Sequence, residues 1–114
     1  APGAVKTLGM DKQTFIRRMA TERRVKWSTH ALKELASEPL SVSVVEIALQ
    51  QAIVIEDYAQ IHRFLPDALV LAFDDSGQPI HCVVAVNEPH GYILIVTLYC
   101  PTSEEWQDDW RTRR

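Results

Sequence analysis

The second half of the chain contains four short runs of β-branched and aliphatic residues, which constrain the fold more than any other feature of the sequence. The runs are IVIEDY, ALVLAFD, PIHCVVAV and YILIVTLYC, at residues 53–58, 68–74, 79–86 and 92–100. Short segments rich in Pro, Gly, Asp and Asn separate them, as expected for strands joined by tight turns. Four strands in direct succession predict an antiparallel meander. Their nearly continuous hydrophobicity predicts cover on both faces, with helices on one face and a partner or the C-terminal segment on the other.

In the first half of the chain, apolar residues recur with the spacing of an α-helix. The stretch DKQTFIRRMATERR, which begins at residue 11, predicts an amphipathic helix with a basic outer face. A second helix, HALKELASE, can be capped by Ser28 or Thr29 and must end near Pro39, because the residue before a proline resists helical backbone. A third helix is expected from the capping-box pattern of Ser43 and Glu46. The predicted class is α+β, with two to three N-terminal helices packed on a four-stranded antiparallel meander sheet.

A short C-terminal helix is expected after the last strand. Thr102 or Ser103 can cap it, and the acidic residues that follow suit the positive end of a helix dipole. Trp106 and Trp110 are four residues apart, so such a helix could lay both indoles against the sheet.

Length and charge limit what the chain can be. Its 114 residues suit one domain, and we expect residues 11–114 to form it and residues 1–10 to be a tag remnant or a disordered N-terminus. A formal net charge of -3 argues against nucleic-acid binding by the molecule as a whole. Any such role must therefore rest on local basic patches.

Cysteine usage and hydropathy suggest a cytoplasmic protein. Cys82 and Cys100 fall in apolar strands without a CxxC pattern, which favours buried free thiols over a disulfide or a metal site. No apolar run approaches the roughly 18 residues needed to span a bilayer, and the first residues lack the apolar core of a signal peptide. No metal or other cofactor is expected, because the histidines and cysteines show no paired ligand spacing.

Two neighbouring strands carry side chains capable of acid–base chemistry. One contains His81, and the next contains Thr97 and Tyr99. In one register, which an odd-numbered loop produces, His81 stands opposite Tyr99 and Val83 opposite Thr97. A shift by one residue places His81 opposite Leu98 and separates the two faces. We predict the first register.

Several of these pieces occur in an order found in a known bacterial family. They are STHALKEL, with His30 at a helix start; IEDY, opening a strand; SGQPIHCVVAV, a turn and a strand with His81; and IVTLYCPTSEEW, a Thr-x-Tyr-x-Pro strand end followed by Trp. In this order the chain resembles the family called domain of unknown function 4258. The resemblance implies a RelE-like α+β fold shared with barnase-type nucleases, a metal-independent ribonuclease toxin, and a small zinc-finger, helix-turn-helix antitoxin of the YgiT type as partner.

A metal-independent ribonuclease needs a base for the ribose 2′-hydroxyl, an acid for the departing 5′-oxygen, and a cation or fixed donors for the phosphorane charge. The residues suited to catalysis by chemical type and by the resemblance are His30, His81, Thr97 and Tyr99. The basic residues suited to RNA binding are Arg23, Arg24, Lys26 and Arg63.

Each candidate also has a structural interpretation. A histidine in an apolar strand is often a satisfied core residue, a histidine at a helix start can cap or pack, and basic stretches are often solvated. Family members commonly carry an arginine after the helical histidine, where this chain reads ASEPLS. Together with the acidic net charge, this departure supports a second hypothesis: a catalytically silent RelE-like module that binds a protein partner.

Overall fold

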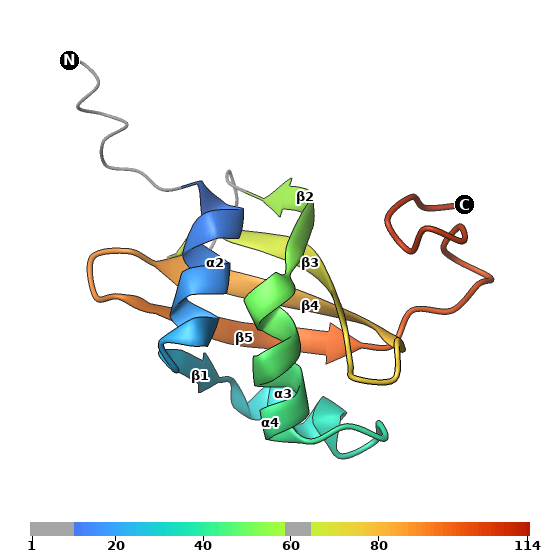
Figure 1. The fold of residues 1–114 in the computed structure, drawn as a ribbon, viewed down its shortest axis with the longest axis horizontal. Coiled ribbons are helices and arrows are strands. Elements are labelled where there is room, and N and C mark those ends of the chain that lie inside the picture. The colour runs from blue at the N-terminus through green and yellow to red at the C-terminus, as the bar shows by residue number, and fades with distance from the viewer. Residues whose placement is uncertain (1–10, 59–64) are drawn as a thin grey trace.

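The protein has an α+β fold in which helices and strands occupy separate layers (Figure 1). The structure is a computed structural model that describes residues 11–58 and 65–114. Its helices are α2 (Lys12–Thr21), α3 (Thr29–Leu35) and α4 (Val42–Ala48), the last continuing into a 3-10 turn, η1 (Leu49–Gln51). Its strands are β1 (Val25–Trp27), β2 (Ile53–Tyr58), β3 (Asp67–Phe73), β4 (Pro79–Asn87) and β5 (Tyr92–Tyr99).

The strands form one mixed sheet in the order β1-β5-β4-β3-β2. Strands β2 to β5 make the predicted antiparallel meander. The expectation of only four antiparallel strands is wrong, because β1 adds a fifth strand that runs parallel to β5, with Val25 opposite Ile93 and Trp27 opposite Ile95. A three-residue segment whose partner lies far along the chain leaves no local sequence signal for this pairing.

Side-chain caps fix where the helices begin. The Ser28 hydroxyl accepts a hydrogen bond from the Ala31 N–H at 2.9 Å, so the predicted cap of α3 is correct. The capping box predicted at Ser43 is wrong, because Ser41 is the cap of α4 and accepts from the Val44 N–H. Glu46 instead accepts from the indole N–H of Trp27 at 2.8 Å, which ties α4 to β1.

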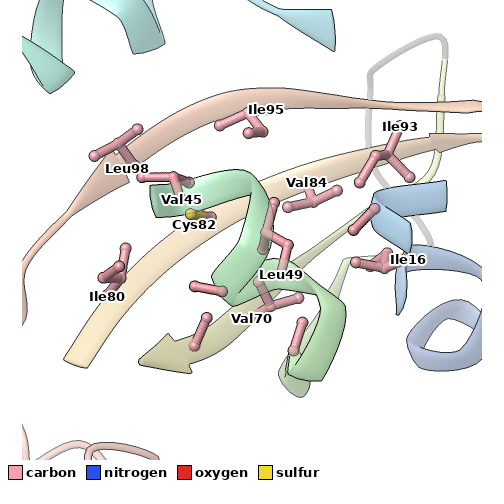
Figure 2. Close-up of a cluster of buried hydrophobic side chains, with 14 of the residues drawn as sticks. Ile16, Val45, Leu49, Val70, Ile80, Cys82, Val84, Ile93, Ile95 and Leu98 are labelled. Atoms are coloured by element: carbon pink, nitrogen blue, oxygen red, sulfur yellow. The ribbon is translucent and has the colours of Figure 1, made fainter. Parts of the chain in front are cut away.

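The main core lies between the helices and one face of the sheet. Figure 2 shows α4 and α2 above β3, β4 and β5, with the apolar side chains between the two layers. Each fully buried aliphatic side chain contributes about 1.5 to 3 kcal/mol of transfer free energy. The labelled members of this cluster are Ile16, Val45, Leu49, Val70, Ile80, Cys82, Val84, Ile93, Ile95 and Leu98.

Part of the opposite face of the sheet is covered by the C-terminal segment, residues 101–114. Trp106 is 1% exposed, and beneath this layer His81 and Leu71 are also buried. The predicted C-terminal helix is wrong: Trp106 forms an isolated bridge with Arg113, so the segment folds back on itself. Asp109 causes this reversal in part, because its carboxylate accepts hydrogen bonds from two backbone N–H groups that a helix would use differently.

Within residues 11–58 and 65–114, no helix is both long enough and apolar enough to cross a membrane.

Candidate functional site

Two β-bulges direct polar side chains toward the sheet face that lies away from the helices. In β2 the register shifts after Val54, so Glu56 pairs with Leu69 and Ile55 is the extra residue. Val54 packs against the helix-side core, whereas Leu69 lies outside that cluster. Without the bulge, Val54 and Glu56 would point to the same side. The extra residue therefore turns Glu56 toward the other face.

The second bulge, in β5, decides the pairing of His81. The loop between Asn87 and Tyr92 has four residues, which is an even number. Such a loop alone would place His81 opposite Leu98, but Val96 is an extra residue that shifts the rest of the strand by one. His81 therefore stands opposite Tyr99, as predicted, although the predicted odd-numbered loop is wrong.

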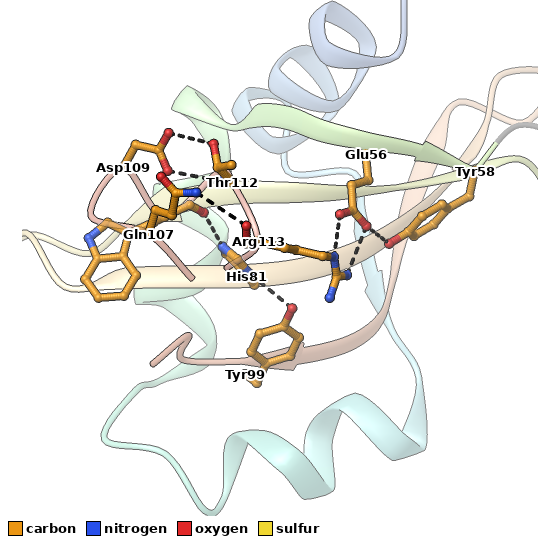
Figure 3. Close-up of polar contacts among 9 residues, drawn as sticks. Glu56, Tyr58, His81, Tyr99, Gln107, Asp109, Thr112 and Arg113 are labelled. Carbon is orange, nitrogen blue, oxygen red and sulfur yellow. Dashed lines mark hydrogen bonds and ion pairs between the residues drawn. The ribbon is translucent and has the colours of Figure 1, made fainter. Parts of the chain in front are cut away.

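His81 is enclosed between Tyr99 and the C-terminal segment (Figure 3). Its Nδ1 lies 3.0 Å from the Tyr99 hydroxyl, and its Nε2 lies 2.7 Å from the backbone oxygen of Trp110. The Trp106 ring packs edge-on against the imidazole, with 4.4 Å between ring centroids. The side chain is 0% exposed, so its two ring nitrogens interact with protein groups only.

These contacts assign the hydrogen atoms around the imidazole. Burial lowers the pKa of His81, and the positive charge of Arg113 acts in the same direction, while the Trp110 carbonyl opposes both. The ring is therefore neutral at pH 7. A carbonyl oxygen can only accept, so Nε2 carries the hydrogen and donates it to Trp110, and Nδ1 accepts the hydroxyl hydrogen of Tyr99.

A second set of polar contacts lies on the same face, between β2 and the C-terminal segment (Figure 3). Arg113 donates to Glu56 through Nε at 2.8 Å and through Nη2 at 3.1 Å, and the Tyr58 hydroxyl donates to Glu56 Oε1 at 2.5 Å. The Arg113 guanidinium also stacks 4.6 Å from the Trp106 ring centroid, and Trp106 in turn contacts His81. We call the five residues Glu56, Tyr58, His81, Tyr99 and Arg113 the sheet-face cluster.

Electrostatics fix the protonation of the sheet-face cluster. The hydrogen bond from Arg113 lowers the pKa of Glu56, so this carboxylate is ionised at neutral pH. Burial raises the pKa of Tyr99, and burial together with the Glu56 hydrogen bond raises the pKa of Tyr58 to about 12. The cluster therefore presents one carboxylate, one guanidinium and two protonated phenols.

The other two catalytic candidates meet at the edge of β5. His30 Nε2 lies 3.2 Å from one oxygen of Glu34, and the other oxygen accepts from the Thr97 hydroxyl at 2.5 Å and the Leu98 N–H at 2.9 Å. The Ser28 hydroxyl donates to the oxygen of the bulge residue Val96, which holds the start of α3 beside the strand. His30 exposes 69% of its side chain and is thus the accessible histidine of the predicted pair.

The four catalytic candidates therefore form two pairs beside β5, one in direct contact and one linked through a carboxylate. His81 contacts Tyr99, and Glu34 links His30 to Thr97. Thr97 and Tyr99 are two residues apart in β5, which places them on one face about 7 Å from each other.

Three of the predicted RNA-binding residues also come together. Arg23, Arg24 and Lys26 line a pocket of about 410 Å³ with His90 and Tyr92. Arg63 lies outside the described residues.

Sequence reasoning missed several groups that complete these sites. Glu34 is four residues after His30 on one helix, and this spacing was a usable signal. The sequence contained no signal for Glu56 or Tyr58. The bulge in β2 breaks the alternation of inward and outward side chains from which their direction would be inferred. Arg113 reaches the cluster only through the fold of the C-terminal segment.

Within residues 11–58 and 65–114, no group of three or more His, Cys, Asp or Glu side chains is arranged to hold a metal ion.

The fold and site define an α+β domain with acid–base side chains on the sheet face that its helices leave open. The chain belongs to the family described as domain of unknown function (DUF4258), whose model matches residues 27–100. No curated protein and no solved structure matches the chain. The matched range includes Glu56, His81 and Tyr99 but ends before the C-terminal segment.

Proposed function

We propose that this chain is a metal-independent endoribonuclease of the RelE-like and barnase-type class. The observation that carries the proposal is the convergence of Glu56, Tyr99 and Arg113 on one sheet face, brought about by two bulges and the C-terminal segment. Bulges are frequent next to active sites because they redirect single side chains. Together the three residues offer a base, a hydrogen donor and a cation.

The proposed reaction uses each of these groups once. The Glu56 carboxylate accepts the proton of the ribose 2′-hydroxyl, and the freed oxygen attacks the adjacent phosphorus. Arg113 exchanges its bonds with Glu56 for bonds to the phosphorane oxygens and balances their charge. The Tyr99 hydroxyl hydrogen, which His81 Nδ1 accepts in the free protein, turns to the departing 5′-oxygen and is transferred to it, and the phenolate then recovers a proton through water from Glu56. The products are a 2′,3′-cyclic phosphate and a free 5′-hydroxyl.

His81 acts on this reaction through Tyr99. Because it is buried, it does not reach RNA, and its Nδ1 orients the phenol hydroxyl, so it is a positioning residue. His30 is exposed and held by Glu34, which suits it to contact substrate beside Thr97.

The test is cleavage of total RNA, both free and on ribosomes, in the presence of EDTA. Wild-type protein is expected to produce fragments ending in a cyclic phosphate. Tyr99→Phe and Glu56→Gln are expected to cut at least ~100-fold more slowly, because each loses a proton-transfer group.

Two exposed carboxylates outside the sheet-face cluster serve as matched controls for Glu56→Gln. Glu88→Gln, in the turn between β4 and β5, and Glu104→Gln, in the C-terminal segment, each remove one negative charge, and both are expected to cut at the wild-type rate. The proposal fails if folded wild-type protein leaves both RNA substrates intact, or if the cluster variants cut as fast as these controls.

The family resemblance supports a role for such an enzyme in a toxin–antitoxin system. We propose a cytoplasmic bacterial toxin whose partner is a small antitoxin of the YgiT type. Among the described residues, large apolar side chains are exposed at Leu32, Val42, Ile47 and Phe73. Ile47 and Phe73 line one shallow pocket between α4 and the end of β3, which is a surface that a protein partner could cover.

A second candidate function rests on the burial of His81. The Trp110 carbonyl occupies Nε2 and the Tyr99 hydroxyl occupies Nδ1, so both ring nitrogens are satisfied as in a purely structural histidine. This supports a catalytically silent interaction module with the same fold. Protein that is folded, binds a partner through the Ile47 and Phe73 surface, and cuts neither RNA substrate would establish it.

A further inference from the structure

A positively charged pocket lies where β1 begins, beside the turn that joins β4 to β5. Its volume is about 410 Å³. It is formed by two short stretches of chain far apart in sequence, and the lining residues are Arg23, Arg24, Val25, Lys26, His90, Gly91 and Tyr92. The pocket is separate from the sheet-face cluster, with which it shares no residue.

The cations of this pocket are incompletely neutralised. Arg24 lies 3.4 Å from a Glu22 oxygen, and the same carboxylate also pairs with Arg18 at 2.8 Å. Among the described residues, neither Arg23 nor Lys26 forms an ion pair, and Lys26 Nζ instead lies 4.3 Å from the centroid of the Tyr92 ring. Of the three cations that line the pocket, only Arg24 pairs with a carboxylate, and it shares that carboxylate with Arg18, so the pocket attracts anions.

The backbone at Arg23 is adapted to this pocket at a cost to local stability. The Arg23 N–H donates to Ala20 and the Arg24 N–H to Met19, which is the hydrogen-bond pattern of a Schellman turn at the end of α2. Such a turn favours glycine at the position of Arg23, whose φ is +62°. An arginine held in this left-handed conformation is an outlier of the kind found at binding sites.

We propose that the basic pocket binds a backbone phosphate of single-stranded RNA. Arginine and lysine donate charge-assisted hydrogen bonds to phosphate oxygens. The exposed imidazole of His90 and the ring of Tyr92 at the pocket wall offer stacking surfaces to unpaired bases, whereas paired bases are stacked within their own helix. The inference deepens the proposed ribonuclease function, on which its choice of ligand rests, by giving the substrate strand a second point of attachment.

Fluorescence anisotropy with a labelled single-stranded RNA of about ten nucleotides tests the proposal. All proteins carry Glu56→Gln, which prevents cleavage during the measurement. Arg23→Gly and Lys26→Gln are each expected to weaken binding several-fold at low salt, and each is expected to reduce the slope of log affinity against log salt by about 0.7. Inorganic phosphate is expected to compete for the parent protein and less for either variant.

Arg23→Gly is chosen because glycine accepts the left-handed backbone, so the variant removes the guanidinium without straining the turn. Its thermal midpoint is expected to be no lower than that of the parent. Lys33→Gln is the matched control, because it removes one exposed positive charge on α3, which lies outside the pocket lining and outside its ion pairs.

The outcomes separate this proposal from the catalytic one. Binding that is absent in the parent, or weakened by Lys33→Gln as much as by the pocket variants, overturns the pocket proposal. Protein that binds RNA through Arg23 and Lys26 but cuts neither RNA substrate overturns the ribonuclease and leaves the pocket established. If the wild type cuts RNA and the pocket variants bind RNA as tightly as the parent, the ribonuclease is established and the pocket proposal is overturned.

Discussion

His81 combines two features that sequence alone presents as alternatives. It is a satisfied core residue, because it is fully buried and both ring nitrogens are hydrogen-bonded. It is also part of an acid–base cluster, because the hydroxyl that it orients belongs to Tyr99. The apolar neighbours of His81 in the sequence predicted its burial, and the strand pairing predicted Tyr99. The carbonyl of Trp110 could not be predicted, since a backbone atom has no residue identity to detect.

The buried imidazole makes the stability of the fold depend on pH. Burial lowers the pKa of His81 below that of the unfolded chain, which is about 6.5, so the unfolded state binds a proton more readily. The contribution of the neutral ring is therefore complete above pH 6.5 and is lost as the pH falls below it. The free energy of unfolding is expected to decrease by at most about 1.4 kcal/mol per pH unit in this window.

Urea unfolding at pH 7.5 and pH 5.5 measures this dependence. His81→Gln, which does not titrate, is the reference that removes the contribution of the carboxylates and of the other histidines. The wild type is expected to lose more stability than this reference between the two pH values. Equal losses in both proteins would show that the pKa of His81 is the same in the folded and unfolded states.

At the scale of the elements, the β-bulges explain where sequence reasoning succeeded and where it failed. The four strands of the meander were predictable because each is a run of β-branched residues bounded by turn residues. The direction of the Glu56 side chain was not predictable, because an extra residue in β2 reverses the alternation of side chains between the two faces. The pairing of His81 with Tyr99 was predicted from an odd-numbered loop, although the extra residue in β5 is what produces it.

The C-terminal segment shows how a helical pattern can be overridden. Trp106 and Trp110 have the spacing of a helix face, but a segment this short forms a helix only marginally on its own. Asp109 offers its carboxylate to the backbone of Arg111 and Thr112, and Trp110 takes a φ of +60°. The resulting reversal buries Trp106 alone and directs the Trp110 carbonyl at His81.

The two tryptophans are therefore expected to differ in their contribution to stability. Trp106→Ala removes a ring that is 1% exposed and leaves a void over His81, so it is expected to lower the free energy of unfolding by about 3 to 5 kcal/mol. Trp110→Ala is expected to cost about 1 kcal/mol or less, because the Trp110 ring is half-buried and alanine keeps the carbonyl. Chemical denaturation of both variants measures the difference, and similar losses would contradict the observed packing.

At the scale of the whole molecule, the sheet is the middle layer of three. The helices α2 and α4 cover one face (Figure 1), and the C-terminal segment covers part of the other, where Trp106 packs on His81. The continuous hydrophobicity of the central strands predicted cover on both faces, and the structure shows that the chain supplies the second cover itself. The layer over His81 must either remain in place during the proposed reaction or move as a separate unit.

Urea unfolding decides between these possibilities, because it shows whether the C-terminal segment unfolds together with the helices and the sheet or before them. Trp27→Phe leaves Trp106 and Trp110 as the fluorescent residues, so fluorescence reports the C-terminal segment while far-ultraviolet circular dichroism reports the helices and the sheet. Because Trp106 packs on His81 and Arg113 pairs with Glu56, we expect the two signals to change at the same urea concentration. RNA would then reach Glu56 and Tyr99 with the segment in place, through the side on which Arg113 is 60% exposed. A fluorescence transition at lower urea would instead show that the segment detaches before the sheet unfolds, which would make its release, and the exposure of His81, a step available to the proposed ribonuclease.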